Sequence, residues 1–385
     1  MTFEFAAPTR IVFGDGEASR LGALAREFGR RAFVVTGTRP GRFGALFDSL
    51  QNADVFTATF TVAGEPTVDT ARAGTEAARA ARSDCVIAIG GGAAIDAGKA
   101  IAALLANPGD PLDYLEVIGK GRPLAHAPVP FIAVPTTAGT GAEATRNAVL
   151  GSPEHRVKVS MRSALMLPRI ALVDPLLTHS CPMDVTAASG LDAITQLLEA
   201  FVSCRANPMT DAFCREGLAR GARALPRVLD DGHDAEARHA MAFAALLGGL
   251  ALANAGLGAV HGFAGPIGGM YPGAPHGALC ARLLPFVMRA NIAALNARRP
   301  GTESLARYGE IARIITNDPN AQPADGVAWA ARIAERAGIP GLATHGITSD
   351  HLPEIVDKAR RASSMKGNPL VLEDGELLHL LREAL

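Results

Sequence analysis

The sequence predicts an α/β protein in which an N-terminal parallel-sheet domain is followed by an all-helical C-terminal domain. Between residues 31 and 174, short apolar runs alternate with stretches of helical periodicity, a pattern typical of a parallel sheet covered by helices. After residue 175, strand-like runs nearly vanish and long amphipathic stretches follow one another. We therefore expect domains at residues 1–178 and 179–385, with the boundary near residues 175 to 185.

Five apolar runs in the first domain have the length and composition of buried strands. In chain order they are residues 32–36, 55–60, 85–89, 131–134 and 170–173. Helical spacing predicts helices at residues 19–28, 68–81 and 94–105. In the second domain, the same spacing predicts helices at residues 185–204, 208–224, 235–255, 277–294, 304–316, 326–337 and 350–362.

Composition excludes several classes of partner. The 385 residues carry a net charge of −1 and no charged tail, which argues against a nucleic-acid partner or an anionic membrane. The longest apolar stretch, Met241 to Val260, is broken by glycines and Asn254, so we expect a buried helix followed by a glycine-rich loop. The five cysteines are scattered and odd in number, and the N-terminus shows no signal-peptide pattern, so we expect a cytoplasmic protein. We expect the cysteines only to fill space.

Two glycine-rich loops are suited to phosphate groups. Gly90, Gly91 and Gly92 follow the strand at residues 85–89 and precede a helix, so backbone N–H groups and the helix dipole can meet an anion. The alternative is a tight turn without a ligand. The second loop, Pro135 to Glu143, supplies small residues and threonine hydroxyls after another strand. Two such loops at strand carboxyl ends predict a dinucleotide site, although their spacing differs from G-x-G-x-x-G.

A group of polar residues in the helical half predicts a metal site. Asp192 and Gln196 lie one turn apart on an otherwise apolar helix, where an unpaired carboxylate costs several kcal/mol. His261 and His276 also lie among small or apolar residues. One carboxylate and two imidazoles, with a position open for substrate, are the ligands of a catalytic metal. The alternative interpretation is that each histidine is packed in the core.

These motifs together resemble the iron-containing, or group III, alcohol dehydrogenase family over nearly the whole chain. The resemblance rests on residues 11–16, 90–99, 135–143, 190–193 and the histidine pair at 261 and 276, all in the family's order. It implies NAD(P)-dependent interconversion of a small alcohol and a carbonyl compound, assisted by Fe²⁺ or Zn²⁺. It also implies a homodimer, in which the segment before Gly14 adds a strand across the interface.

The resemblance assigns residues to each site. It implies that Asp192, His261 and His276 are catalytic metal ligands, with Gln196 as a weaker fourth ligand. The residues that it assigns to the cofactor are Gly37, Thr38, Arg39, Gly91, Gly92, Ala93, Asp96, Thr136, Thr137, Thr140 and Lys158.

Four positions depart from the family pattern. Gln196 stands where the family usually has a histidine ligand, and Gly265 where many members have another histidine. Ala93 replaces a common serine, a mild change. Arg39 follows the first strand where NAD-preferring members place an aspartate, which favours NADP over NAD because a cation suits the 2′-phosphate. Arg39 as an ordinary solvated residue is the alternative.

Three other functions fit parts of the pattern. A metal-independent, maleylacetate-type reductase acting on an acidic substrate would account for Gln196. A lyase on the related dehydroquinate-synthase scaffold would need a more polar helical domain than this one. A nucleotide-binding protein without catalysis is the third.

Overall fold

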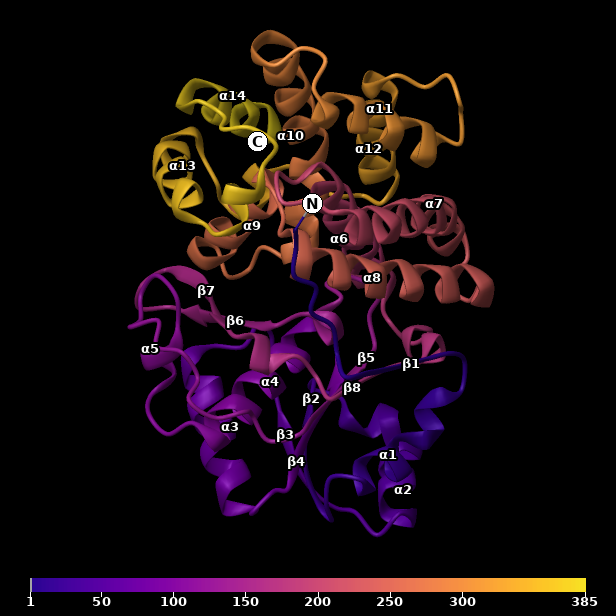
Figure 1. The fold of residues 1–385 in the computed structure, drawn as a ribbon, viewed down its shortest axis with the longest axis vertical. Helices are drawn as coiled ribbons and strands as arrows, with labels where there is room; N and C mark the ends of the chain where they lie inside the picture. Colours follow the sequence, from indigo (N-terminus) through magenta and orange to yellow (C-terminus); the bar gives the residue numbers. More distant parts are fainter. Residues whose placement is uncertain (1) are drawn as a thin grey trace. The chain divides into compact units, whose positions relative to one another are not determined.

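The computed structural model describes residues 2–385, which form two compact units. Residues 6–137 and 141–181 form one, here called the sheet unit. Residues 138–140 and 182–385, together with the first few residues of the chain, form the other, here called the helical unit. The predicted fold class, a parallel sheet followed by an all-helical region, is confirmed (Figure 1).

The sheet unit is built on six parallel strands in the order β1-β8-β5-β4-β2-β3. They are β1 (Arg10–Phe13), β2 (Arg31–Thr36), β3 (Phe56–Thr61), β4 (Cys85–Gly90), β5 (Phe131–Pro135) and β8 (Ile170–Val173). All but β1 coincide with predicted strands to within one residue at either end. β1 was not predicted as a strand of this sheet; it pairs in parallel with β8 and lies at the edge of the sheet, and its expected pairing across a dimer interface stays a prediction.

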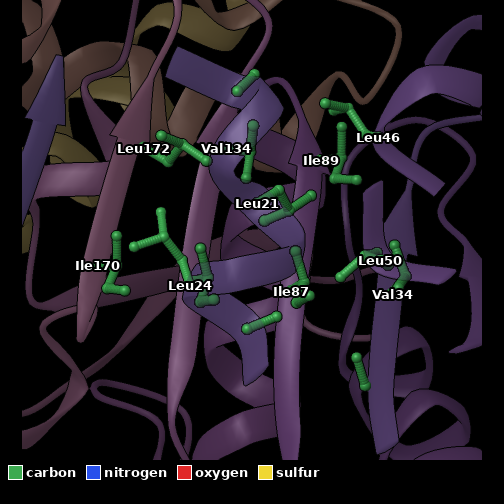
Figure 2. Packing of buried hydrophobic residues seen from close by; sticks show 14 of the residues in the cluster. Leu21, Leu24, Val34, Leu46, Leu50, Ile87, Ile89, Val134, Ile170 and Leu172 are labelled. Carbon is green, nitrogen blue, oxygen red and sulfur yellow. The ribbon is translucent and has the colours of Figure 1, made fainter. Parts of the chain in front are cut away.

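Helices cover both faces of this sheet. They are α1 (Leu21–Arg26), α2 (Gly44–Asn52), α3 (Val68–Ala80) and α4 (Gly92–Ala106), and the short α5 (Pro111–Tyr114) packs against α3. Figure 2 shows leucines of α1 and α2 against one face, where every second strand residue, such as Val34 and Ile87, points toward them. The intervening residues, such as Phe33 and Val86, pack against α3 and α4. Burial on both faces explains why these strands are continuously apolar.

A hairpin of β6 (Asn147–Ser152) and β7 (Val157–Arg162) was not predicted. Its two strands are antiparallel and fully bury only alternate residues, so neither contains the continuous apolar run that marks the parallel strands. The hairpin packs on α4, where the buried Lys99 ammonium donates hydrogen bonds to the carbonyls of Thr145 and Asn147 at 3.1 and 2.8 Å. The hairpin is therefore fixed by contacts that are distant in sequence.

The helical unit contains nine α-helices within the described residues. They are α6 (Met183–Val202), α7 (Pro208–Asp230), α8 (Ala235–Ala255), α9 (Ala259–Met270), α10 (His276–Arg298), α11 (Glu303–Thr316), α12 (Pro323–Arg336), α13 (Leu352–Arg361) and α14 (Asp374–Ala384). Helix α6 is central, because it packs against α7, α8 and α10 and is buried continuously from Gly190 to Val202. A polar side chain on this part of α6 therefore faces protein on every side.

The buried helix and glycine-containing loop expected between Met241 and Val260 are confirmed as α8 and residues 256–258, but helix α9 after them was not predicted. The chain bends by 97° between α8 and α9, at a turn where Gly256 has a φ of 69°, and then continues as helix. The glycines of α9 allow close packing, because a β-carbon on Gly262 would lie 2.9 Å from the Met365 side chain. Packing thus outweighs the low helix propensity of glycine here.

Helix α10 is long and apolar enough to span a membrane by composition, with a mean hydropathy of 1.4 over its most apolar window. The helix itself was predicted at residues 277–294, although its membrane-like composition was not. Most of that window, 67%, is buried inside the unit, as in the core helix of a water-soluble protein, which passes the same test.

Candidate cofactor and metal sites

The loops predicted to bind a dinucleotide begin at one edge of the sheet. The pairing of Thr36 with Ile89 and of Gly90 with Pro135 aligns the carboxyl ends of β2, β4 and β5. The chain leaves β2 toward β3 on one side and returns to β4 on the other, so the order reverses between β2 and β4. Ligands of open α/β sheets bind at such a reversal. The backbone nitrogen of Gly37 lies there, 3.7 Å from the position of a β-carbon on Gly90.

The N-terminus of α4 has the features of a phosphate-binding turn. Gly91 is its N-cap, and no side chain among residues 2–385 caps the helix. The N–H groups of Gly92 and Ala93 in the first turn therefore have no intrahelical partner. A β-carbon on Gly91 would lie 3.3 Å from the Thr137 side chain, so a larger residue would crowd Thr137 at this turn. Gly91, Gly92, Ala93 and Thr137 thus fit a pyrophosphate bound by backbone amides.

Other residues predicted to bind the cofactor are more dispersed. Thr136 follows β5 and is only 9% exposed, whereas Thr38 and Arg39 follow β2 and are exposed. Thr140 belongs to the helical unit, although Thr136 and Thr137 belong to the sheet unit.

Asp96 and Lys158 have polar partners within the sheet unit. The Asp96 carboxylate accepts a hydrogen bond from the Val149 amide at 3.1 Å and lies 3.8 Å from Lys99 Nζ. Burial raises the pKa of Asp96 against the pull of Lys99, and burial lowers the pKa of Lys99. The Lys158 ammonium lies 3.4 Å from a Glu65 carboxylate oxygen. These partners tie α4 and β7 to their neighbours, and a role of Asp96 or Lys158 at a cofactor stays a prediction.

The helical unit brings the three predicted metal ligands together. Asp192 lies in the middle of α6, His261 in the first turn of α9 and His276 at the first position of α10. His261 Nε2 is 3.1 Å from Asp192 Oδ1, and the rings of His261 and His276 are 5.5 Å apart between centroids. Cys280, one turn after His276, completes a group of four whose donor atoms all lie within 4.8 Å of one another.

The spacing of these donor atoms fits a divalent metal ion. Bonds of about 2.0 Å to nitrogen or oxygen and about 2.3 Å to sulfur put the donors of a tetrahedral site roughly 3.3 to 3.8 Å apart. Cys280 Sγ lies 3.7 Å from His261 Nε2 and 3.6 Å from His276 Nε2. With the 3.1 Å contact between His261 and Asp192, three of these separations fall in or near that range.

Glu199 orients the central imidazole of this group. It lies on α6, seven residues after Asp192, and its carboxylate accepts a hydrogen bond from His261 Nδ1 at 2.7 Å. The same carboxylate accepts the backbone N–H groups of Val260 at 2.7 Å and His261 at 3.3 Å. With Nδ1 donating to Glu199, Nε2 of His261 faces Asp192 and the donor group, and it would bind a cation after losing its proton. A carboxylate in this position is the usual outer partner of a metal-binding histidine.

Electrostatics couple these side chains. Burial works to raise the pKa of Asp192, but the hydrogen bond from His261 and the charge of His276 hold it below its usual range. Burial opposes the charge on His261, yet Cys280, Asp192 and Glu199 together raise its pKa well above that of a free imidazole. Burial raises the pKa of the Cys280 thiol to about 12, with His261 pulling it down. This group of side chains thus favours positive charge, and a divalent cation supplies such charge.

Gln196 does not extend freely toward this group. Its Nε2 donates to the Gly139 carbonyl at 3.1 Å, which fixes the direction of the amide. Its Oε1 is buried and has no hydrogen-bond partner among residues 2–385. The role of Gln196 as a weak metal ligand stays a prediction. Its hydrogen bond to Gly139 joins α6 to the loop at residues 138–140.

Sequence reasoning missed Cys280 and Glu199. Cys280 was expected only to fill space, yet it stands four residues after His276, the spacing that brings two side chains to one helix face. Glu199 carries a similar signal, since it is an acidic residue in the same buried helix as Asp192. Neither signal is decisive alone, because both depend on α6, α9 and α10 meeting.

Comparison with known proteins identifies the family. The sequence profile described as "Iron-containing alcohol dehydrogenase" matches residues 8–175. The profile described as "Fe-containing alcohol dehydrogenase family, C-terminal" matches residues 186–385. The 1,3-propanediol dehydrogenase of Citrobacter freundii is 33% identical over 392 aligned positions, which cover 99% of this chain and 98% of the relative. The 4-hydroxybutyrate dehydrogenase of Cupriavidus necator is 32% identical over 98% of both chains.

Solved structures agree with this result. The crystal structure of a 1,3-propanediol oxidoreductase superposes with a TM-score of 0.90 at 32% identity, covering all of both chains. An alcohol dehydrogenase from Oenococcus oeni superposes with a TM-score of 0.91 at 29% identity, again over all of both chains. Both halves of the sequence and the whole fold point to the same conclusion: the chain belongs to the iron-containing alcohol dehydrogenase family.

Proposed function

We propose that this protein is an NAD(P)-dependent, metal-assisted dehydrogenase that interconverts a small alcohol and the corresponding aldehyde or ketone. The observation that carries the proposal is the largely buried group of Asp192, His261 and His276, in which Glu199 orients the His261 imidazole. Relatives that span nearly the whole chain and are named as alcohol and diol dehydrogenases support the reaction class.

The sheet unit would bind the nucleotide. The amides at the start of α4 would receive the pyrophosphate, with Thr137 beside them. The nicotinamide of the bound cofactor would exchange a hydride with the carbon of the alcohol or carbonyl. The chain itself binds and orients the cofactor and keeps water from the reacting atoms.

The helical unit would bind the metal. A divalent cation supplies Lewis-acid polarisation of the substrate oxygen when it is bound. Asp192, His261 and His276 would hold it, and Glu199 would keep the His261 ring in the orientation that binding requires. The low pKa of Asp192 keeps this carboxylate ionised and ready to bind a cation near neutral pH.

The nucleotide preference proposed here is for NADP(H). Arg39 is exposed just after β2, and within the described chain its side chain makes no hydrogen bond or ion pair. A guanidinium at this point of the fold suits a 2′-phosphate, whereas a carboxylate would suit the ribose hydroxyl of NAD.

The proposal is tested by metal analysis together with turnover. Protein purified without added metal or chelating resin is assayed for bound Fe and Zn, and for oxidation of NADPH and NADH with short aldehydes. The panel includes aldehydes corresponding to 1,3-propanediol and 4-hydroxybutyrate, since two relatives bear those names. We expect about one metal ion per chain and activity that chelation abolishes.

Two other results would overturn parts of the proposed function. Turnover by metal-free protein would overturn the metal-assisted reaction and favour a maleylacetate-type reductase, for which the glutamine at position 196 is the supporting observation. Nucleotide binding without turnover on any alcohol, aldehyde or ketone would overturn the dehydrogenase itself.

A further inference from the structure

The proposed metal site lacks an obvious fourth protein ligand, and the structure limits which side chain can supply one. The family's usual histidine is replaced by Gln196, whose amide nitrogen is committed to the Gly139 carbonyl. The side chain could therefore offer only its Oε1, a neutral amide oxygen, to a cation. Amide oxygens suit Ca²⁺ and Mg²⁺ better than the transition metals that imidazoles prefer.

Cys280 offers a stronger donor in the same group. It lies one turn after His276 on α10, is fully buried, and directs its Sγ to within 3.6 Å of His276 Nε2 and 3.7 Å of His261 Nε2. A buried cysteine that merely packs has apolar neighbours. This one instead faces two imidazole nitrogens and a carboxylate.

We propose that Cys280, and not Gln196, is the fourth protein ligand, which gives a metal site of one carboxylate, two imidazoles and one thiolate. The inference rests on the proposed function only in assuming that the helical unit binds a divalent metal. The thiol proton leaves to solvent when the cation binds, because the thiolate is the form that ligates. A set of this kind favours Zn²⁺ or Co²⁺ over Mg²⁺ or Mn²⁺.

The cysteine also compensates geometrically for the glutamine. The usual histidine at 196 would reach the metal from α6, beside Asp192. Cys280 reaches the same group from α10, beside His276, so the number of ligands is kept while one of them moves from one helix to another. Helices α6 and α10 pack directly against each other, which makes this exchange sterically simple.

Titration of the metal-free protein with Co²⁺ tests the proposal without relying on activity. Thiolate bound to Co²⁺ gives a near-ultraviolet charge-transfer band that nitrogen and oxygen ligands do not give. We expect this band in the unchanged protein and its loss in Cys280→Ser and Cys280→Ala. The affinity for Zn²⁺ should fall by at least the roughly 10- to 100-fold that loss of an outer partner causes.

Two matched variants serve as controls. Cys204→Ser removes an exposed cysteine outside the group and should keep the band and the affinity. Gln196→Ala should keep the band and change Zn²⁺ affinity by only a few fold. Circular dichroism and thermal melting of each metal-free variant establish that it is folded, so a lost band is assigned to the ligand and not to unfolding.

The outcomes separate this inference from the proposed function. A Co²⁺ complex without the thiolate band, or a Gln196→Ala variant that loses metal while Cys280→Ala retains it, would overturn the role of Cys280 and leave the dehydrogenase intact. A thiolate band in a protein that never turns over NAD(P)H would leave Cys280 as a ligand and overturn the dehydrogenase.

Discussion

At the scale of single residues, the helical unit shows how a buried charge is accommodated. Asp192 is 2% exposed on a helix that is otherwise largely apolar, and its carboxylate is offset by the imidazole of His261. His261, on α9, also donates a hydrogen bond to Glu199, which lies on α6 together with Asp192. Three ionisable groups thus contact one another, and removing His261 would leave both carboxylates buried without their imidazole partner.

Glu199 supports the first prediction. Glu199→Gln should lower metal affinity by about 10- to 100-fold, because the amide no longer attracts the His261 Nδ1 proton as a carboxylate does. Isothermal titration of the metal-free variant with Zn²⁺ measures this. Glu216→Gln, which changes an exposed glutamate on α7, is the control and should bind like the unchanged protein. An unaltered affinity in Glu199→Gln would show that the carboxylate serves only the backbone of α9.

Arg39 supports the second prediction. Arg39→Ala should reduce kcat/KM for NADPH about tenfold or more and leave NADH nearly unchanged, since a charge-assisted hydrogen bond contributes about 1.5–3 kcal/mol. Initial rates with both nucleotides measure the ratio. The matched control is Arg332→Ala, which removes an exposed arginine from α12 in the helical unit. Equal losses with NADPH and NADH would contradict a contact with the 2′-phosphate.

At the scale of elements, close approach of α6 and α10 brings the donor atoms together. His276 and Cys280 share one face of α10, while Asp192 and Glu199 project from α6. Gly277 allows this approach, because a β-carbon there would lie 2.5 Å from the carbonyl oxygen of Ala188 on α6. The site therefore depends on a residue that is not itself a ligand.

Gly277 supports the third prediction. Gly277→Ala forces α10 away from α6 and should lower the free energy of unfolding by about 1–3 kcal/mol, as overpacking does. It should also weaken Zn²⁺ binding. Chemical denaturation and metal titration measure the two effects.

A matched control comes from α9. A β-carbon on Gly265 meets nothing within 4 Å, so Gly265→Ala should be neutral or should stabilise the protein by about 0.5–1 kcal/mol through helix propensity. If Gly277→Ala and Gly265→Ala change the free energy of unfolding by the same amount, α6 and α10 accommodate the added methyl group more easily than the packing at Gly277 indicates.

At the scale of the whole molecule, the free energy of unfolding depends on pH through a buried carboxyl group that lies outside the group of Asp192, His261 and His276. Glu143 is 3% exposed in the sheet unit, and burial raises its pKa to about 7, with Lys99 opposing the shift. The folded protein therefore binds this proton more tightly than the unfolded chain. Its contribution to stability is full below the unfolded pKa and is lost as the pH rises through about 7.

Glu143→Gln supports the fourth prediction. Relative to the unchanged protein, the variant should gain stability between about pH 5 and about pH 8, on the order of 3 kcal/mol at full effect. Urea unfolding of the metal-free protein across this range measures the difference. Glu216→Gln again serves as control and should leave the pH profile unchanged. A constant difference between Glu143→Gln and the unchanged protein would mean that the carboxyl keeps an ordinary pKa.

The sequence by itself determined the fold class and most of the elements. Continuous apolar runs such as residues 85–89 and 131–134 are detectable because strands buried on both faces contain little else. The grouping of Asp192, His261 and His276 was also predictable, since polar residues in apolar helices need partners.

Only the tertiary structure decided the rest. The hairpin of β6 and β7 and the helix α9 depend on contacts with α4 and Glu199, which local propensity does not encode. Glu199 and Cys280 lie near the two histidines because α6, α9 and α10 pack together. Gln196 donates a hydrogen bond to the carbonyl of Gly139, which lies 57 positions earlier in the chain. Sequence spacing specifies which side chains share a helix face, but the packing of helices specifies which faces meet.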